Sequence, residues 1–311
     1  MKSEQIVSDL EKEIESYFEK GYRLDMIMPA DSPTSARVSR NGDVVCLQTS
    51  QPNSHDESLN ENEIIVTRFD DNIWVEGRAG MQYRDLIPGR LGGHVIASHI
   101  RLANGGEVPD YVHYHKVRFQ MIYCKSGWIR VVYEDQGPPF VLNAGDCVLQ
   151  PPEIRHRVLE SSTGAEVIEI GCPAVHETWI DHGMQLPTPN FQPERIFNGH
   201  RFVRYVASEA KWIESPVDGF EMNDIGVTSA TNGLVQVWIS RSISPSVEKF
   251  SASQVHWSRS WFIFVLSGNL RLRTREQNTF KLNTGDNLVV PAGIEFTLQS
   301  DNNLEILEIL F

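Results

Sequence analysis

Three histidines and a glutamine in the first half of the sequence have residue types and spacing suited to a metal site: His113, His115, Gln120 and His156. Side chains two residues apart on an extended segment point to the same face, so the ring nitrogens of His113 and His115 can converge on one point. Turn-forming residues separate this pair from His156, as expected when short strands fold back on one another: Gly127, Gly145-Asp146 and Pro151-Pro152. The pattern predicts a metal centre inside a small β-barrel.

The ligand types indicate which ions this centre would accept. Three neutral imidazoles and an amide oxygen suit one borderline divalent ion per chain, such as Fe(II), Ni(II), Zn(II) or Mn(II). Gln120 is uncharged and would leave the full charge on the ion, which favours an anionic oxygen ligand such as a carboxylate or an enediolate. The sequence leaves open whether Gln120 ligates the ion or whether the site has three histidines only.

Two further polar residues are candidates for catalysis. His99 and Arg101 share one face of the strand expected at residues 94–102, because side chains alternate along a strand. If that face points into the barrel, the two side chains could bind a substrate anion or move a proton. If it points outward, they belong to an ordinary solvated face.

An amphipathic helix is expected near the N-terminus, at residues 4–20. Its apolar positions recur every four residues, with acids and lysines between them: Ile6, Leu10, Ile14 and Phe18. Ser3 and Ser8 are each suitable caps, and Gly21 ends the run. Such a helix typically packs on the outside of a barrel or at a subunit contact.

Short strand-like segments separated by turn residues dominate the rest of the chain, and they predict an all-β sandwich or barrel. They lie at residues 64–69, 94–102, 119–123, 128–133, 147–150, 157–159 and 167–170. A polar segment at 51–62 is expected to be a loop, and the proline-rich segment 187–193 is typical of a linker.

The strand pattern returns about 140 residues later in the chain. Trp74-Val75-Glu76 is echoed by Trp212-Ile213-Glu214, the segment before Gly127 by residues 260–268, and residues 145–151 by residues 285–291. Echoes at a nearly constant offset indicate duplication. We therefore expect two copies of one β-domain.

These residues resemble the cupin superfamily. Its first motif has His-x-His, an acid after three or four residues and a glycine after six more, and this spacing matches His113-Tyr114-His115, Gln120 and Gly127 with one substitution. Its second motif has Gly, five residues, Pro-x-Gly, two residues and His, and this spacing matches Gly145, Pro151, Glu153 and His156 with Glu153 in place of glycine. Both motif frames occur twice, so the chain is similar to a bicupin over most of residues 60–311.

The resemblance implies that the two copies differ in chemistry. The second copy has Gln254, His256, Trp261 and Phe296 at the four ligand positions. Tryptophan and phenylalanine cannot ligate a metal, and they would fill the barrel with apolar volume. The implied fold is all-β, with two tandem cupin (double-stranded β-helix or jelly-roll) barrels behind an N-terminal amphipathic helix. The expected domains are a helix and extension at 1–60, a metal-binding barrel at 61–186, and a degenerate barrel without metal at 187–311.

The composition limits the partners. A net charge of −13 argues against a nucleic-acid surface, which needs clustered Lys and Arg. No apolar run approaches the ~18 residues of a membrane helix, and the N-terminus has no signal-peptide pattern. The four cysteines form no CxxC pair and are expected to be free thiols. We expect a cytoplasmic homodimer with a small-molecule ligand and no nucleic-acid or membrane partner.

The resemblance implies a metalloenzyme acting on a small oxygenated or anionic organic molecule. Similar bicupins include dioxygenases that cleave rings or diketones, and this reaction type is slightly favoured. Similar proteins also include sugar-acid isomerases and cyclising enzymes, which need no redox change. A non-catalytic ligand-binding or sensory bicupin is the alternative from a different class.

Overall fold

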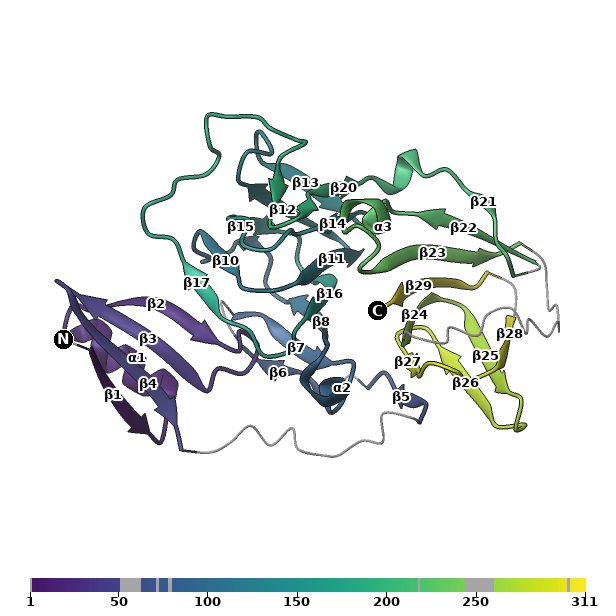
Figure 1. The fold of residues 1–311 in the computed structure, drawn as a ribbon, viewed down its shortest axis with the longest axis horizontal. Coiled ribbons are helices and arrows are strands. Elements are labelled where there is room, and N and C mark those ends of the chain that lie inside the picture. Colours follow the sequence, from purple (N-terminus) through teal and green to yellow (C-terminus); the bar gives the residue numbers. More distant parts are fainter. Residues whose placement is uncertain are drawn as a thin grey trace. The chain divides into compact units, whose positions relative to one another are not determined.

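The structure is a computed structural model that describes residues 2–50, 63–70, 73–77, 80–217, 219–243, 260–300 and 303–311 (Figure 1). Strands dominate these residues, which confirms the expected all-β fold. The chain forms two compact units: Met1–Ser58, Trp74–Asp85 and Gly89–Phe202 in the first, and Leu59–Ile73, Leu86–Pro88 and Val203–Phe311 in the second. Compact units need not coincide with sequence domains, so the three-part division stays a prediction. The expected loop at 51–62 lies outside the described residues.

The N-terminal part of the first unit is a helix on a sheet. Helix α1 (Leu10–Glu19) begins after Asp9, whose side chain accepts a hydrogen bond from the Lys12 backbone N–H at 3.1 Å. The helix is shorter than expected because residues 2–7 form a strand that pairs in parallel with another strand. This pairing outweighs the local helical periodicity. The strands are β1 (Lys2–Val7), β2 (Arg23–Met28), β3 (Ser35–Arg40) and β4 (Asp43–Thr49).

Two sheets form the barrel of the first unit. One contains β10 (His113–His115), β15 (His156–Ser161), β12 (Trp128–Tyr133) and β13 (Phe140–Asn143), with β9 (Gly106–Glu107) beside β15, and β17 (Thr178–Ile180) joins it to β2. The other has the order β14 (Cys147–Leu149), β11 (Phe119–Ser126), β16 (Ala165–Cys172), β8 (Ile96–Leu102), β7 (Gln82–Asp85) and β6 (Val75–Glu76). Smaller elements are α2 (Arg90–Gly93) and the ribbon of β18 (Ile196–Phe197) and β19 (His200–Arg201).

The turn between β11 and β12 requires glycine. Gly127 has φ +68°, and a Cβ at this position would lie 2.3 Å from Ser162 Oγ and 3.1 Å from Ala165 Cα. Any larger residue would be strained in its backbone and would clash with the neighbouring turn. The motif glycine therefore sets the hairpin that leads from Gln120 on β11 into β12.

The second unit repeats this arrangement. One sheet has the order β21 (Ile213–Glu214), β22 (Phe220–Asp224), β23 (Gln236–Ser242), β29 (Glu305–Leu310), β24 (Trp261–Ser267), β27 (Asn287–Val290) and β5 (Ile65–Thr67). The facing sheet has the order β26 (Thr279–Asn283), β25 (Asn269–Thr274) and β28 (Phe296–Ser300). The unit also contains β20 (Val203–Tyr205), the 3-10 turn η3 (Ala207–Glu209) and the short helix α3 (Val227–Ala230).

The strand register confirms that the two barrels are copies of one unit. Gln120 lies opposite Gly171 in the first barrel, and Trp261 lies opposite Leu310 in the second. Two residues further along each strand pair, a glutamate occupies the same place: Ile122 faces Glu169, and Ile263 faces Glu308.

None of the helices in the described residues has the length and apolar character needed to span a membrane.

Candidate metal centre and its pocket

The three motif histidines come together at one end of the first barrel. His113 and His156 are opposite each other on the antiparallel strands β10 and β15, and His115 is two residues further along β10. One side-chain nitrogen from each histidine lies within 4.8 Å of the corresponding nitrogens of the other two, and all three residues are buried. The period-2 alternation of a strand therefore produces the convergence expected from the sequence.

The Nδ1 atom of each ring has an oxygen partner within the chain. His113 Nδ1 lies 2.8 Å from the Tyr111 carbonyl, and His156 Nδ1 lies 3.0 Å from the Ile154 carbonyl. His115 Nδ1 lies 2.9 Å from the Thr178 hydroxyl. A carbonyl can only accept, so Nδ1 of His113 and of His156 carries the proton and Nε2 keeps its lone pair. Such contacts orient histidine ligands in metal sites.

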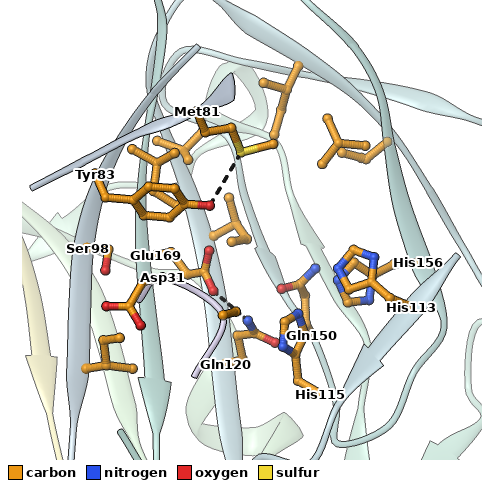
Figure 2. Close-up of a pocket in the computed structure, with 18 of the residues that line it drawn as sticks. Asp31, Met81, Tyr83, Ser98, His113, His115, Gln120, Gln150, His156 and Glu169 are labelled. Atoms are coloured by element: carbon orange, nitrogen blue, oxygen red, sulfur yellow. Dashed lines mark hydrogen bonds between the residues drawn. The ribbon is translucent and has the colours of Figure 1, made fainter. Parts of the chain in front are cut away.

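Gln120 contacts a carboxylate that the sequence motif did not reveal. Its Nε2 donates a hydrogen bond to Glu169 Oε1 at 2.7 Å. With the nitrogen directed to Glu169, the amide oxygen points toward the histidines, as Figure 2 shows. Both side chains line the same pocket. Glu169 is on β16, beside the strand that carries Gln120. Position 169 therefore supplies a carboxylate close to the position where the motif usually has one.

The donor set fits a divalent transition metal. Three imidazoles have their Nδ1 atoms held by the chain, and an amide oxygen is directed toward them. Nitrogen and oxygen donors of this kind suit borderline divalent ions. His113, His115 and His156 could hold such an ion, with Gln120 Oε1 as a fourth donor.

A largely apolar pocket of about 80 Å³ adjoins the histidines (Figure 2). Its carbon-rich wall comes from both sheets of the barrel: Met81, Ile96, Ile100, Leu102, Ile122, Ile129, Val131, Val158 and Val167. Among the described residues that line it there is no lysine or arginine, whereas Asp31 and Glu169 each contribute a carboxylate. This lining is suited to a small carbon skeleton and offers no cationic side chain to an anion.

Several polar residues of the pocket were not anticipated from the sequence. Gln150 directly follows β14, and its Nε2 donates to the Tyr133 hydroxyl at 2.9 Å. His176 packs edge-on against His115, with ring centroids 5.4 Å apart, and burial lowers its pKa. Asp31 comes from the segment after β2, which the sequence suggested was only an extension. Gln150 directly precedes the motif residue Pro151, and this position was the signal in the sequence that could have placed it in the pocket. His176 and Asp31 lie outside both motifs, so the motifs did not indicate them.

His99 and Arg101 are not brought to this pocket. The pocket is lined by Ile96, Ser98, Ile100 and Leu102, so the odd-numbered side chains of β8 face the other way. His99 is fully buried between Arg84 and Glu166, at 3.1 and 3.0 Å, and burial lowers its pKa to about 4. The interpretation of these two residues as catalytic residues of the pocket is therefore corrected.

Arg101 has a structural counterpart in the other barrel. Its guanidinium lies 4.2 Å from the centroid of the Trp74 ring and bonds Glu166. In the second barrel, Arg241 lies 3.9 Å from the Trp212 ring. Since the pair recurs in a barrel with apolar residues at motif ligand positions, it serves the packing of the outer strands.

Comparison with known proteins agrees with the cupin resemblance. Residues 98–171, which include the three histidines and Gln120, match the family Cupin_2, described as a cupin domain. No curated protein is similar to the chain in sequence.

Solved structures with the same fold cover most of the chain. Protein Ylba from E. coli is 15% identical with a TM-score of 0.56, over 81% of this chain and 92% of that chain. A variant of oxalate decarboxylase from Bacillus subtilis is 16% identical with a TM-score of 0.58, over 83% and 79%. A putative glyoxylate induced protein from Pseudomonas aeruginosa is 12% identical with a TM-score of 0.57, over 79% and 88%. At these identities the likeness concerns the fold.

Proposed function

Because the chain has the cupin fold and residues 98–171 form a cupin domain, we propose that it is a metal-dependent enzyme acting on a small oxygenated organic molecule. The observation that carries this proposal is the convergence of three buried histidines, within 4.8 Å of one another, beside an apolar pocket. His113, His115 and His156 are the proposed ligands, with Gln120 Oε1 as the fourth.

A bound divalent ion would polarise an oxygen of the substrate and make a neighbouring O–H or C–H more acidic. Glu169 is the residue that we propose accepts this proton at its carboxylate. Gln120 fixes the direction of that carboxylate through its 2.7 Å hydrogen bond. The apolar wall around Ile122 and Val167 limits the access of water to the reacting group.

The pocket favours an uncharged substrate over an anion. Gln120 alone would leave the charge of the ion uncompensated, but Glu169 returns a negative charge to the same space. Asp31 adds a second carboxylate to the lining, and its partner Arg90 is not among the lining residues. A dianion would meet these carboxylates without a cationic side chain to bind it.

Deprotonation by Glu169 is compatible with two overall reactions. Oxygen-dependent cleavage, as in a dioxygenase, is the reaction that we propose first, because the apolar pocket excludes water from a reactive carbanion. Isomerisation or cyclisation without oxygen is the second, and Glu169 beside the metal ligands favours it because proton transfer alone completes such a reaction. Ligand binding without turnover would instead identify a sensory protein.

The test screens diketones, phenolics and sugar acids for turnover and oxygen uptake, with the wild type and with Glu169→Gln. We expect Glu169→Gln to keep its metal and to lose turnover by about 10²–10⁴-fold, the usual contribution of a general base. Glu160→Gln, a partly exposed residue of β15 that pairs with Arg130 and does not line the pocket, is the matched control and should keep activity. Full activity of Glu169→Gln would reject the assigned base, and absence of metal from the wild type would reject the proposed function.

A further inference from the structure

An unpartnered acceptor is buried in the wall of the pocket. Gln150 is 3% exposed, and its amide nitrogen is committed to the Tyr133 hydroxyl. Its Oε1 atom is buried and has no hydrogen-bond partner within the described part of the chain. A buried amide oxygen without a partner carries a desolvation cost. In Figure 2 the Gln150 side chain is drawn in the same pocket as the three histidines and Gln120. A donor on a bound molecule would satisfy it.

Two other polar groups of the pocket are also acceptors. Asp31 Oδ1 is buried without a partner among the described residues, while Oδ2 bonds Arg90. His176 donates its Nδ1–H to the Pro173 carbonyl at 2.8 Å, so its Nε2 carries a lone pair. Gln150 Oε1, Asp31 Oδ1 and His176 Nε2 would therefore each suit a donor on the ligand.

A hydroxyl is the uncharged group that suits the Gln150–Tyr133 pair. It can donate to Gln150 Oε1 and at the same time accept from the Tyr133 O–H, which is paired with the same amide. A carboxylate cannot donate, and it would lie near Asp31 and Glu169.

We propose that the pocket binds an uncharged molecule with a hydroxyl-bearing apolar skeleton, and that Gln150 Oε1 is the acceptor that selects it. The proposal rests on the proposed function of the same site, because it defines the substrate class of that site. The apolar wall packs on the skeleton, and the hydroxyl donates to Gln150.

The second barrel serves as an internal comparison. The Gln150 backbone N–H bonds the Gln120 carbonyl, and the corresponding strand pair in the second barrel matches Trp261 with Val290. Val290 is buried and offers no acceptor. The barrel that has tryptophan in place of Gln120 thus also has an apolar residue in place of Gln150, as expected if the amide belongs to a ligand site.

The test measures binding of three probes that share one ring: cis-cyclohexane-1,2-diol, cis-1,2-difluorocyclohexane and cyclohexanecarboxylate. Ligand-observed NMR titration of the full-length wild type should show the diol binding at least tenfold more tightly than the difluoride, which has similar size but no donor, and than the carboxylate. Gln150→Met, which keeps length and removes the acceptor, should lower diol affinity about tenfold, the loss expected for one hydrogen bond. Gln82→Leu, on β7 but outside the pocket lining, is the control and should bind as the wild type does.

Three results would overturn the proposal: equal binding of the diol and the difluoride, tighter binding of the carboxylate, or unchanged diol affinity in folded Gln150→Met. The comparison of the three probes uses the wild type alone, so it tests the hydroxyl preference even if Gln150→Met fails to fold. Metal content, measured on the same samples, separates the two proposals. A metal-loaded protein that prefers the carboxylate would contradict the hydroxyl preference alone, whereas a protein without metal at the histidines would contradict the proposed function.

Discussion

Each motif histidine has its Nδ1 atom tied to the chain, and one ring nitrogen of each lies within 4.8 Å of the others. The types and spacing of His113, His115 and His156 were sufficient to predict this convergence, because strand alternation is a local rule. Glu169 could not be predicted in the same way. It lies 49 residues from Gln120 in the chain, and only the pairing of β11 with β16 brings the two side chains to 2.7 Å.

The contact between Gln120 and Glu169 gives a prediction at the residue scale. Gln120→Glu places two carboxylates in contact in the metal-free protein, and Glu169→Gln places two amides there. Gln120→Glu should lower the free energy of unfolding by about 1.5–3 kcal/mol, because a hydrogen bond to a charged group is lost. Glu169→Gln should lower it less, because two amides can still form a weaker, uncharged hydrogen bond. The double exchange, Gln120→Glu with Glu169→Gln, restores one carboxylate and one amide and should recover most of that loss. Urea denaturation of the four metal-free proteins measures the coupling.

The coupling energy between Gln120→Glu and Glu169→Gln tests whether the two side chains share the hydrogen bond. Losses that simply add, with no recovery in the double exchange, would contradict the hydrogen bond and the orientation assigned to the Gln120 amide. Surface variants such as Glu160→Gln provide the baseline.

At the scale of elements, the direction of a strand face was the information missing from the sequence. His99 and Arg101 were correctly predicted to share a face of β8, but which face points inward depends on the partners of the strand. In the structure Ser98 and Ile100 line the pocket, and His99 lies behind it. The N-terminal helix could be predicted because its apolar periodicity is a local feature of the sequence. Its first residue could not, because residues 2–7 form β1 by pairing with the distant strand β4.

The second barrel buries the carboxyl group of Glu308 between strands β23 and β29, and this group should make the free energy of unfolding depend on pH. Glu308 is the counterpart of Glu169 in the strand register, and here Trp238 Nε1 donates to it at 2.9 Å together with the Ser240 hydroxyl. Burial raises its pKa from 4.5 to about 7, against the effect of these hydrogen bonds. The same strand position thus carries Glu169, which lines the pocket of the first barrel, and Glu308, which is hydrogen-bonded to Trp238 in the second barrel.

We expect the free energy of unfolding to fall as pH rises from about 4.5 to about 7. In this window the folded chain keeps a proton on Glu308 that the unfolded chain has released, so rising pH favours unfolding. The stabilisation is fully present below the pKa of the unfolded state and is lost on passing the folded pKa. Its size is on the order of 3 kcal/mol, from 1.36 kcal/mol per pKa unit.

Glu308→Gln should remove this fall, and the exposed Glu276→Gln should retain it. Chemical denaturation at pH 5, 6, 7 and 8 makes the comparison. A wild type and a Glu308→Gln variant with parallel pH profiles would show that Glu308 does not hold its proton in the folded state.

At the scale of the whole molecule, the duplication could be predicted from the sequence, because the motif spacing repeats about 140 residues later. Both barrels keep the glycine turns and the strand register, and they differ at the pocket, where Trp261 and Phe296 pack together with ring centroids 5.3 Å apart. Gln254 and His256, which occupy two motif ligand positions of the second copy, lie outside the described residues. The repeated turns and register therefore determine the fold, whereas the residues that differ at the pocket determine the chemistry.

The chain should therefore bind its metal at one of its two barrels. Elemental analysis of protein purified without added metal tests this most directly, on the wild type, on the His113→Ala/His156→Ala double variant and on His182→Ala, a partly exposed histidine that bonds the Leu24 carbonyl. We expect one divalent transition metal per chain in the wild type and in His182→Ala, and none in the double variant. Full metal occupancy in the folded double variant would contradict it.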